Sequence, residues 1–384
     1  LGLVGPRVIE FGPTPDGVAP ALRDNPDTWL KFTDLVLIDP VGTGWSRTAK
    51  SDGAGQFWSV RADAQALAKV IALYVARNNR TASPKYILGE SYGGFRAAKV
   101  ARAMQQEQGI VASGIVMLSP LLEGSFQFGG NRFALGAALH LPSLAAAEMD
   151  RRKAFSADEL AKIERFALTE YLATLAGPAP QGEPARRFYA RVAELTGLPV
   201  DVVTRTRGFV RDAYVKNVLE RQSQVVSPYD ATHAAPDPFP ESESEEGADP
   251  ILDGYLQALG GAFVGYARDE LGFKTEMTFM LLNREVSGKW EWGEGRRSQP
   301  SVTRDIRELL ALNPGFRLLI AHGRSDLVTP YGVSRYVLDH IPPIGPPERA
   351  QLKIYKGGHM FYLDPQPRAA FSADAAAFYR TPGL

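Results

Sequence analysis

The chain of 384 residues contains no cysteine. Disulfides, iron–sulfur clusters, zinc ribbons and a thiol nucleophile are therefore excluded together, although the absence does not fix the cellular compartment. An excess of one charge is also lacking, because 43 Lys and Arg balance 43 Asp and Glu. A nucleic-acid or anionic-membrane partner would need a basic face, so we expect neither. No run of 18 apolar residues occurs, and we expect no membrane span.

What is present is typical of a folded protein, with 45% hydrophobic and 22% charged residues. The length allows one large α/β domain or two to three smaller ones. The chain begins at Leu1 rather than Met, and residues 1–7 form neither a charged leader nor an apolar signal core. We therefore expect a processed or truncated chain.

Strand and helix patterns alternate in the first third and again near the C-terminus. Short apolar runs of the kind expected of strands buried on both faces occur at residues 35–39, 85–89, 114–119, 317–321 and 351–355. Helical patterns fall at residues 60–75, 95–106, 302–310, 331–339 and 368–379. This alternation predicts a mostly parallel sheet with helices on both faces.

The middle of the chain has a different periodicity. Helical candidates lie at residues 156–175 and 184–196, and residues 235–250 hold six carboxylates and no basic residue. That acidic run predicts a solvated loop, with an acidic docking segment as the alternative. We expect an α/β core from residues 1–121 and 300–384, carrying a mainly helical cap inserted as residues 122–299.

The strongest chemical motif is Gly89-Glu90-Ser91-Tyr92-Gly93, which fits G-x-S-x-G between a predicted strand and a predicted helix. A serine on such a sharp turn needs small neighbours, so that its hydroxyl stands clear of the sheet. The same turn would aim the Tyr92 backbone N–H at an oxyanion. Ser91 is the predicted nucleophile; the alternative is a Gly-rich turn with a capping serine.

A serine hydroxyl needs a base, and five histidines are available: His140, His233, His322, His340 and His359. His359 follows the last predicted strand and two glycines that let a loop turn toward the site, so it is the predicted base. His340 ends a helix, where a cation is favourable. The others lie in the cap or before the predicted acid.

The acid should follow the predicted strand at residues 317–321. Asp326 comes a few residues after it and would hold the imidazole tautomer and stabilise the imidazolium. A turn residue that caps the next helix is the alternative for Asp326, and Asp364 is a weaker rival for the role.

Other chemistries find little support. Gly42-Thr43-Gly44 lacks the third glycine of a dinucleotide fingerprint, and Gly44-Trp45-Ser46 lacks the closing glycine of a second nucleophile turn. The sequence has no H-E-x-x-H and no phosphate-binding G-x-x-x-x-G-K motif. We therefore expect no metal and no cofactor.

These motifs together resemble the serine carboxypeptidases. Gly89-Glu90-Ser91-Tyr92-Gly93-Gly94 is similar to that family's active-site hexapeptide, and residues 39–46 (Asp-Pro-Val-Gly-Thr-Gly-Trp-Ser) resemble its second motif. Residues 323–326 and 358–360 resemble the surroundings of its catalytic Asp and His. The likeness covers nearly the whole chain, and the missing cysteine resembles the bacterial members. It implies an α/β-hydrolase fold with a helical insertion.

One departure stands out. Family members carry an Asn-Gly-Gly-Pro-Gly loop upstream of the segment that residues 1–7 resemble, and this loop supplies an oxyanion-hole N–H and an asparagine for the substrate carboxylate. The sequence here begins after that loop and after the first strands of the family's core. We therefore expect a chain truncated at its N-terminus.

The resemblance implies removal of C-terminal residues from peptides with a free C-terminus, through an acyl-enzyme on Ser91. Glu90 would bind the free α-carboxylate. It also implies a periplasmic or secreted location; the oligomeric state stays open. Six cap aromatics could contact an apolar substrate or form core: Phe126, Phe128, Phe133, Tyr229, Trp290 and Trp292.

Without the resemblance, the residues alone indicate a serine hydrolase with a helical cap. Rival readings are an aminopeptidase, an esterase or an acyltransferase on the same scaffold. A non-catalytic binding protein is the rival from another class, because the oxyanion loop is absent from this sequence.

Overall fold

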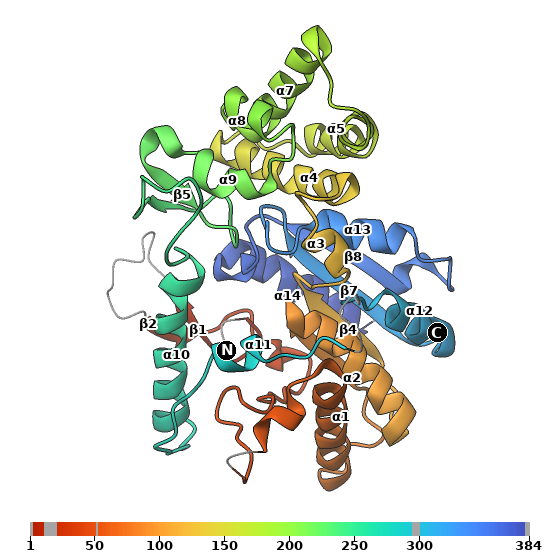
Figure 1. Cartoon of the computed structure of the whole chain (residues 1–384). Helices are drawn as coiled ribbons and strands as arrows, with labels where there is room; N and C mark the ends of the chain where they lie inside the picture. The colour runs from red at the N-terminus through yellow and green to blue at the C-terminus, as the bar shows by residue number, and fades with distance from the viewer. Residues whose placement is uncertain (1–2, 11–20, 51–52, 294–299, 381–384) are drawn as a thin grey trace.

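The computed structural model describes residues 3–10, 21–50, 53–293 and 300–380 (Figure 1). Its centre is a four-stranded parallel sheet in the order β3-β4-β7-β8. The strands are β3 (Tyr86–Glu90), β4 (Gly114–Leu118), β7 (Arg317–Gly323) and β8 (Ala350–Tyr355). Four of the five predicted strands are thereby confirmed.

Helices cover both faces of this sheet. On one face, Ile115 and Met117 of β4 pack with Phe95 of α2 (Tyr92–Gln108) and Ile306 of α12 (Thr303–Leu312). Alternate residues of the same strands face α14 (Pro365–Arg380). Two further helices, α1 (Val60–Arg77) and α13 (Tyr331–Asp339), lie on the α2 side. A strand buried on both faces reads as a continuous apolar run, which is why β4 and β7 were recognisable.

The strand expected at residues 35–39 is absent, and that prediction was wrong. This segment is irregular, and Val36 and Leu37 are 49% and 67% exposed. Leu35 and Ile38 pack against two separate apolar clusters, one on each side of β3. An apolar run specifies that some side chains are buried, but a strand also needs a partner backbone. Within the described ranges, β3 is hydrogen bonded to β4 alone.

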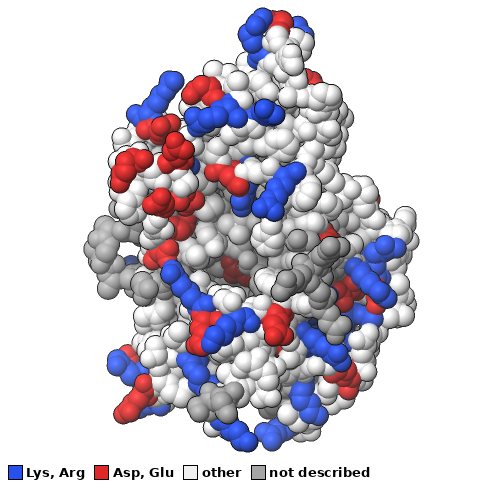
Figure 2. Space-filling view, in the orientation of Figure 1, with Lys and Arg blue, Asp and Glu red and all other residues white. Residues whose placement is uncertain are grey.

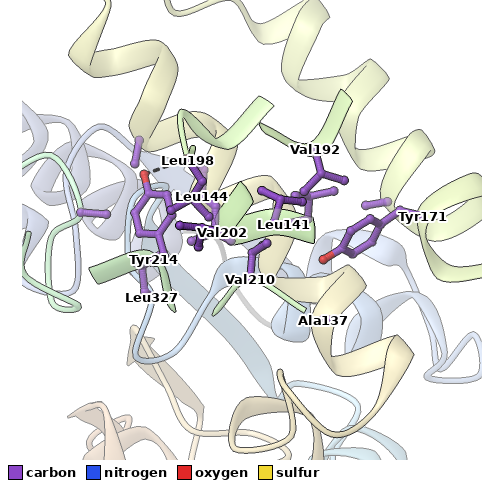
Figure 3. Packing of buried hydrophobic residues seen from close by; sticks show 14 of the residues in the cluster. Ala137, Leu141, Leu144, Tyr171, Val192, Leu198, Val202, Val210, Tyr214 and Leu327 are labelled. Carbon is purple, nitrogen blue, oxygen red and sulfur yellow. Dashed lines mark hydrogen bonds between the residues drawn. The ribbon is translucent and has the colours of Figure 1, made fainter. Parts of the chain in front are cut away.

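A layer of helices lies above the sheet in the view of Figure 1. At its centre is α4 (Ala134–Arg151), in which every residue from Gly136 to Ala147 is buried. Leu141 and Leu144 of α4 pack with Val192 and Val202 of the neighbouring helices and with Val210, which directly precedes α9 (Figure 3). The other helices of the layer are α3 (Gly124–Gln127), α5 (Ala157–Phe166), a π-helical turn (Ala167–Tyr171), α6 (Leu172–Ala176), α7 (Gly182–Thr196), α8 (Val200–Arg205) and α9 (Arg211–Asn217).

An antiparallel hairpin that the sequence patterns did not predict closes this layer. Its strands are β5 (Gln224–Val226) and β6 (Ala234–Pro236), and they are joined by residues 227–233. The acidic run that follows is irregular and largely exposed, as expected of a solvated loop. Figure 2 shows acidic side chains gathered on this side of the helical layer, and the face is hollowed between the layer and the part that holds the sheet.

The rest of the predicted cap contacts the N-terminal third of the chain instead. It contains α10 (Leu252–Asp269) and α11 (Arg284–Gly288). Backbone bridges join Gly44 to Met280 and Ser59 to Glu291. A second hairpin, β1 (Arg7–Glu10) with β2 (Ala21–Asp24), packs nearby through the Arg7–Glu270 ion pair. The predicted cap boundary at residue 299 lies outside the described residues. No helix within the described ranges is both long and apolar enough to cross a bilayer.

Candidate active site

The turn between β3 and α2 presents Ser91. Its backbone has a positive φ, which few residues other than glycine adopt, with φ 56° and ψ −121°. A Cβ added to Gly89 would lie 1.9 Å from the Gly93 carbonyl oxygen, so only glycine fits there. The sequence therefore permits the sharp strand–turn–helix geometry that exposes a nucleophilic serine.

Tyr92 is the first residue of α2. The N–H groups of a helix's first turn have no intrahelical partner, and the N-terminus of a 17-residue helix carries a partial positive charge. This end of α2 is suited to an oxyanion. That Tyr92 supplies the hydrogen bond stays a prediction.

Four polar residues follow the four strands at their carboxyl ends. Ser91 comes after β3 and Ser119 after β4, while Asp326 and His359 follow β7 and β8. Because the strands are parallel and adjacent, their carboxyl ends meet at one edge of the sheet. The predicted nucleophile, acid and base therefore come from the same edge.

Asp326 and His359 form a buried hydrogen-bonded pair. His359 Nδ1 lies 2.8 Å from Asp326 Oδ2, and the two residues are 4% and 0% exposed. Backbone N–H groups of Val328 and Thr329 donate to Asp326 Oδ1 at 2.8 and 3.0 Å. Burial opposes both charges, but the mutual contact outweighs it: the pKa of Asp326 is lowered and the pKa of His359 is raised.

Two hydroxyl residues that the sequence reasoning missed support this pair. Ser119 Oγ donates to the His359 carbonyl at 2.8 Å, and Ser119 itself has a left-handed φ of 40°. Thr329 Oγ1 lies 2.7 Å from Asp326 Oδ2 and 2.8 Å from the Ser119 carbonyl. The signal for Ser119 was available, because it ends a predicted strand at the same sheet edge as Ser91.

Between Ser91 Oγ and the His359 imidazole, the described residues show no hydrogen bond, so this contact stays a prediction. The rival residues have other partners. His322 Nε2 bonds Ser334 Oγ at 2.7 Å, and Asp364 caps the first turn of α14. Burial lowers the pKa of His140 and of His322 to about 4. His340 directly follows the last residue of α13, which is the helix-end position predicted for it.

Glu90, directly before Ser91, is held by a residue that the sequence analysis did not consider. The Tyr362 hydroxyl donates to Glu90 Oε2 at 2.8 Å. Burial is the largest influence on this carboxyl and raises its pKa, against opposing contributions from His359 and the Tyr362 bond. The site thus contains a carboxyl group that resists ionisation beside the predicted nucleophile.

The cap aromatics divide into four groups. Tyr229 meets the His359 ring edge-on, with centroids 5.4 Å apart. Trp290 and Trp292 meet Tyr92 edge-on at 5.2 and 5.4 Å. Phe126 packs on Tyr336, whereas Phe128 and Phe133 are 60% and 58% exposed. Three of the six therefore lie next to predicted site residues.

No cluster of three or more metal-ligating side chains occurs in the parts of the chain that the structure describes. The arrangement is compatible with acyl transfer by a serine, since the predicted nucleophile, base and acid and the N-terminus of α2 lie at one edge of the sheet.

Residues 4–123 match the family described as serine carboxypeptidase. No curated protein matches the chain. Among solved structures, the fold is similar to that of KEX1(delta)p, a prohormone-processing carboxypeptidase from Saccharomyces cerevisiae, with a TM-score of 0.55 and 12% identity over 99% of this chain and 79% of that one. Two others are proline iminopeptidase from Mycobacterium smegmatis (TM-score 0.32, 15% identity, 86% and 75% covered) and VinJ (TM-score 0.35, 14% identity, 89% and 79% covered).

The matched stretch contains two of the four segments that carry the resemblance, the loop at residues 39–46 and the turn at residues 89–94, whereas residues 323–326 and 358–360 lie outside it. The resemblance is thereby confirmed over residues 4–123, which match the serine carboxypeptidase family, and the fold is that of an α/β hydrolase with many added helices.

Proposed function

We propose that the protein is a serine carboxypeptidase that removes C-terminal residues from peptides through an acyl-enzyme on Ser91. The observation that carries the proposal is the convergence of Ser91, Asp326 and His359 at one sheet edge, in a chain whose first third matches that family. Its substrates are peptides with a free C-terminus. A periplasmic or secreted location stays a prediction.

In the proposed reaction, His359 Nε2 takes the Ser91 hydroxyl proton as Ser91 Oγ attacks the carbonyl carbon of the last peptide bond. The tetrahedral oxyanion is stabilised at the N-terminus of α2, with the Tyr92 N–H as donor. The C–N bond then breaks, and the imidazolium gives its proton to the leaving amine. Water attacks the acyl-enzyme by the same route. Asp326 keeps the Nδ1 proton in place and stabilises the imidazolium.

We assign Glu90 to the substrate's α-carboxylate. Two carboxylates in contact repel each other, and removing both from water adds a further cost, so binding favours a shared proton. The raised pKa of Glu90 suits a neutral carboxyl that donates to the substrate. Tyr362 bonds Oε2, and within the described ranges Oε1 has no protein partner, which leaves that oxygen for the ligand.

The test compares an N-terminally blocked peptide that has a free C-terminus with its C-terminal amide. The parent enzyme should hydrolyse the acid far better than the amide, and KM for the acid should rise as pH increases and Glu90 ionises. Glu90→Gln keeps a donor that never ionises, so its KM for the acid should stay flat at alkaline pH. The amide should show no such difference.

Equal hydrolysis of acid and amide would contradict carboxypeptidase specificity. Identical alkaline loss of affinity in the parent and in Glu90→Gln would show instead that Glu90 has a structural role. Labelling of Ser91 by a fluorophosphonate separates both results from a failure of the serine chemistry, since only an activated serine reacts.

A further inference from the structure

Residues 227–231, in the hairpin of the helical layer, contact both loops that carry the predicted acid and base. The Tyr229 carbonyl accepts from the His359 N–H at 2.5 Å. The Pro228 carbonyl accepts from the Leu327 N–H at 3.0 Å, and the Ala231 N–H donates to the Ser325 carbonyl at 3.1 Å. One short segment is thus hydrogen bonded to residues on both sides of Asp326 and to His359 itself.

A side-chain contact adds to these backbone bonds. Ser325 is fully buried, and its hydroxyl donates to Asp230 Oδ1 at 2.8 Å. The same oxygen accepts from the Thr232 N–H at 3.0 Å and from the Thr232 hydroxyl at 2.7 Å. Asp230 is therefore fixed within its own loop while it holds the residue directly before Asp326.

Residues 227–231 and the loops that carry Asp326 and His359 are packed too closely to move past one another. A Cβ added to Gly358 would lie 2.1 Å from the Tyr229 carbonyl oxygen and 2.5 Å from Asp230 Cα. A Cβ added to Gly323 would lie 2.0 Å from the Gly358 carbonyl oxygen. Since close-packed groups transmit displacement, a shift of residues 227–231 must move the histidine loop.

The C-terminal end of α4 binds both residues 227–231 and the loop that carries Asp326. Arg151 Nη1 donates to the Ala231 carbonyl at 2.6 Å. Its neighbour Asp150 pairs with Arg324 of the acid loop at 2.5 Å, and both side chains are largely buried. The main helix of the layer therefore holds residues 227–231 and the acid loop at once.

We propose that Asp230 is a positioning residue that acts through Ser325 to hold Asp326 and His359 in hydrogen-bonding register. In this proposal the helical layer covers the acid–base pair and also fixes the positions of Asp326 and His359 relative to each other. The inference deepens the proposed function, since it assumes that this pair activates Ser91. It does not depend on the substrate.

The main test is Ser325→Ala, which removes one hydroxyl. A small misplacement of reacting groups can cost up to about 10²-fold in rate, so we expect kcat to fall on the order of 10- to 100-fold with KM unchanged. His359 faces Asp326, Glu90, His322 and Tyr229. Loosening the Asp326 contact destabilises the imidazolium, so the acidic limb of the kcat profile should move to lower pH.

Variants of Asp230 test whether the effect of Ser325→Ala on kcat comes from the loss of the Asp230–Ser325 contact. Asp230→Ala should behave like Ser325→Ala, whereas Asp230→Asn keeps an acceptor oxygen and should restore most of the activity. The double variant Asp230→Ala with Ser325→Ala should be no slower than either single variant, because both remove the same contact. Additive losses would overturn the proposal.

Asp237→Asn is the matched control, because Asp237 lies just after β6 and pairs with Lys216 at 2.6 Å without touching either catalytic loop. It should lower Tm without changing kcat or the pH profile. The NMR resonance of the His359 Nδ1 proton gives a readout that needs no turnover: it should move in Ser325→Ala and stay in Asp237→Asn.

If Ser325→Ala lowers Tm but leaves kcat, the pH profile and this resonance unchanged, the contact only stabilises the fold and the proposal is wrong. If the parent does not react with a fluorophosphonate, the proposed function fails, and the resonance still decides whether Asp230 positions the pair.

Discussion

The apolar cluster of the helical layer and the buried groups at the carboxyl edge of the sheet are built from opposite kinds of residue. The cluster around α4 consists of aliphatic and aromatic side chains such as Leu141, Val192 and Tyr171. At the sheet edge, the residues exposed by 4% or less include Ser119, Asp326 and His359. Apolar burial stabilises without direction, whereas buried polar groups cost free energy unless each finds its partner. We therefore expect the cluster around α4 to contribute most to the free energy of unfolding, and the sheet edge to position the reacting groups.

Backbone strain follows the same division. In and beside the helical layer, the left-handed residues other than glycine are Lys153, Arg207 and Ser223, which lie at helix ends and are exposed. At the sheet edge, Ser91 and Ser119 have positive φ beside the predicted site, and Ser119 is fully buried. Strain held in place by packing is expected where a structure must position a reactive group.

The largest expected effect is on activity alone. Ser91→Ala removes the proposed nucleophile and should lower kcat on the order of 10⁶-fold, as for removal of a nucleophile that acts as a unit with its base. The neighbouring turn keeps its glycines, so Tm should not fall. Turnover close to that of the parent would remove Ser91 from the mechanism.

The second effect should be on stability alone. Leu141 is fully buried at the centre of the α4 cluster, so Leu141→Ala should lower the free energy of unfolding by about 2–5 kcal/mol. Below the unfolding transition, kcat per folded molecule should match that of the parent. Denaturant unfolding and active-site titration measure the two quantities separately. A loss of kcat in the folded variant would mean that packing in the α4 cluster also affects the geometry of the sheet edge.

The smallest effect distinguishes two hydroxyls with similar contacts. Tyr362→Phe and Tyr355→Phe each remove a bond to a carboxyl group, at 2.8 Å to Glu90 and 2.7 Å to Asp374. Each should cost no more than about 1.5–3 kcal/mol of stability. The Tyr362 bond lowers the pKa of Glu90, so its loss should raise that pKa. Only Tyr362→Phe should then move the alkaline rise of KM for acid peptides to higher pH. An equal shift in Tyr355→Phe would show an indirect origin.

Much of the sheet was predictable because its strands are short apolar runs that end at polar or glycine residues. β4 and β7 are buried on both faces, and their continuous runs of apolar residues indicate this. Residues 35–39 have the same pattern without a partner strand, and no local signal distinguishes the two cases. The ends of the strands also pointed to Ser91, Asp326 and His359 as the candidate nucleophile, acid and base, because chain order predicts which loop carries which group.

The supporting contacts could not be predicted in this way. Asp230 meets Ser325 across 95 residues of sequence, and Tyr362 meets Glu90 across 272. Neither pair has a spacing, a periodicity or a motif that marks it. Such contacts depend on how the helical layer docks on the sheet, which is a property of packing rather than of any segment. The hairpin that carries Asp230 was missed for the same reason, since its strands have three residues each.

The largely exposed acidic run at residues 237–250 divides the components of the proposed site unequally along the chain. A protease cut there would leave Ser91, Ser119 and residues 227–231 on one fragment, and Asp326 and His359 on the other. Neither fragment alone could carry out the proposed reaction. The β4–β7 ladder, the bridges Gly44–Met280 and Ser59–Glu291, and the contacts of residues 227–231 with the acid and histidine loops would be among the contacts that join them. Activity regained on mixing separated fragments would thus report that these noncovalent contacts suffice for complementation.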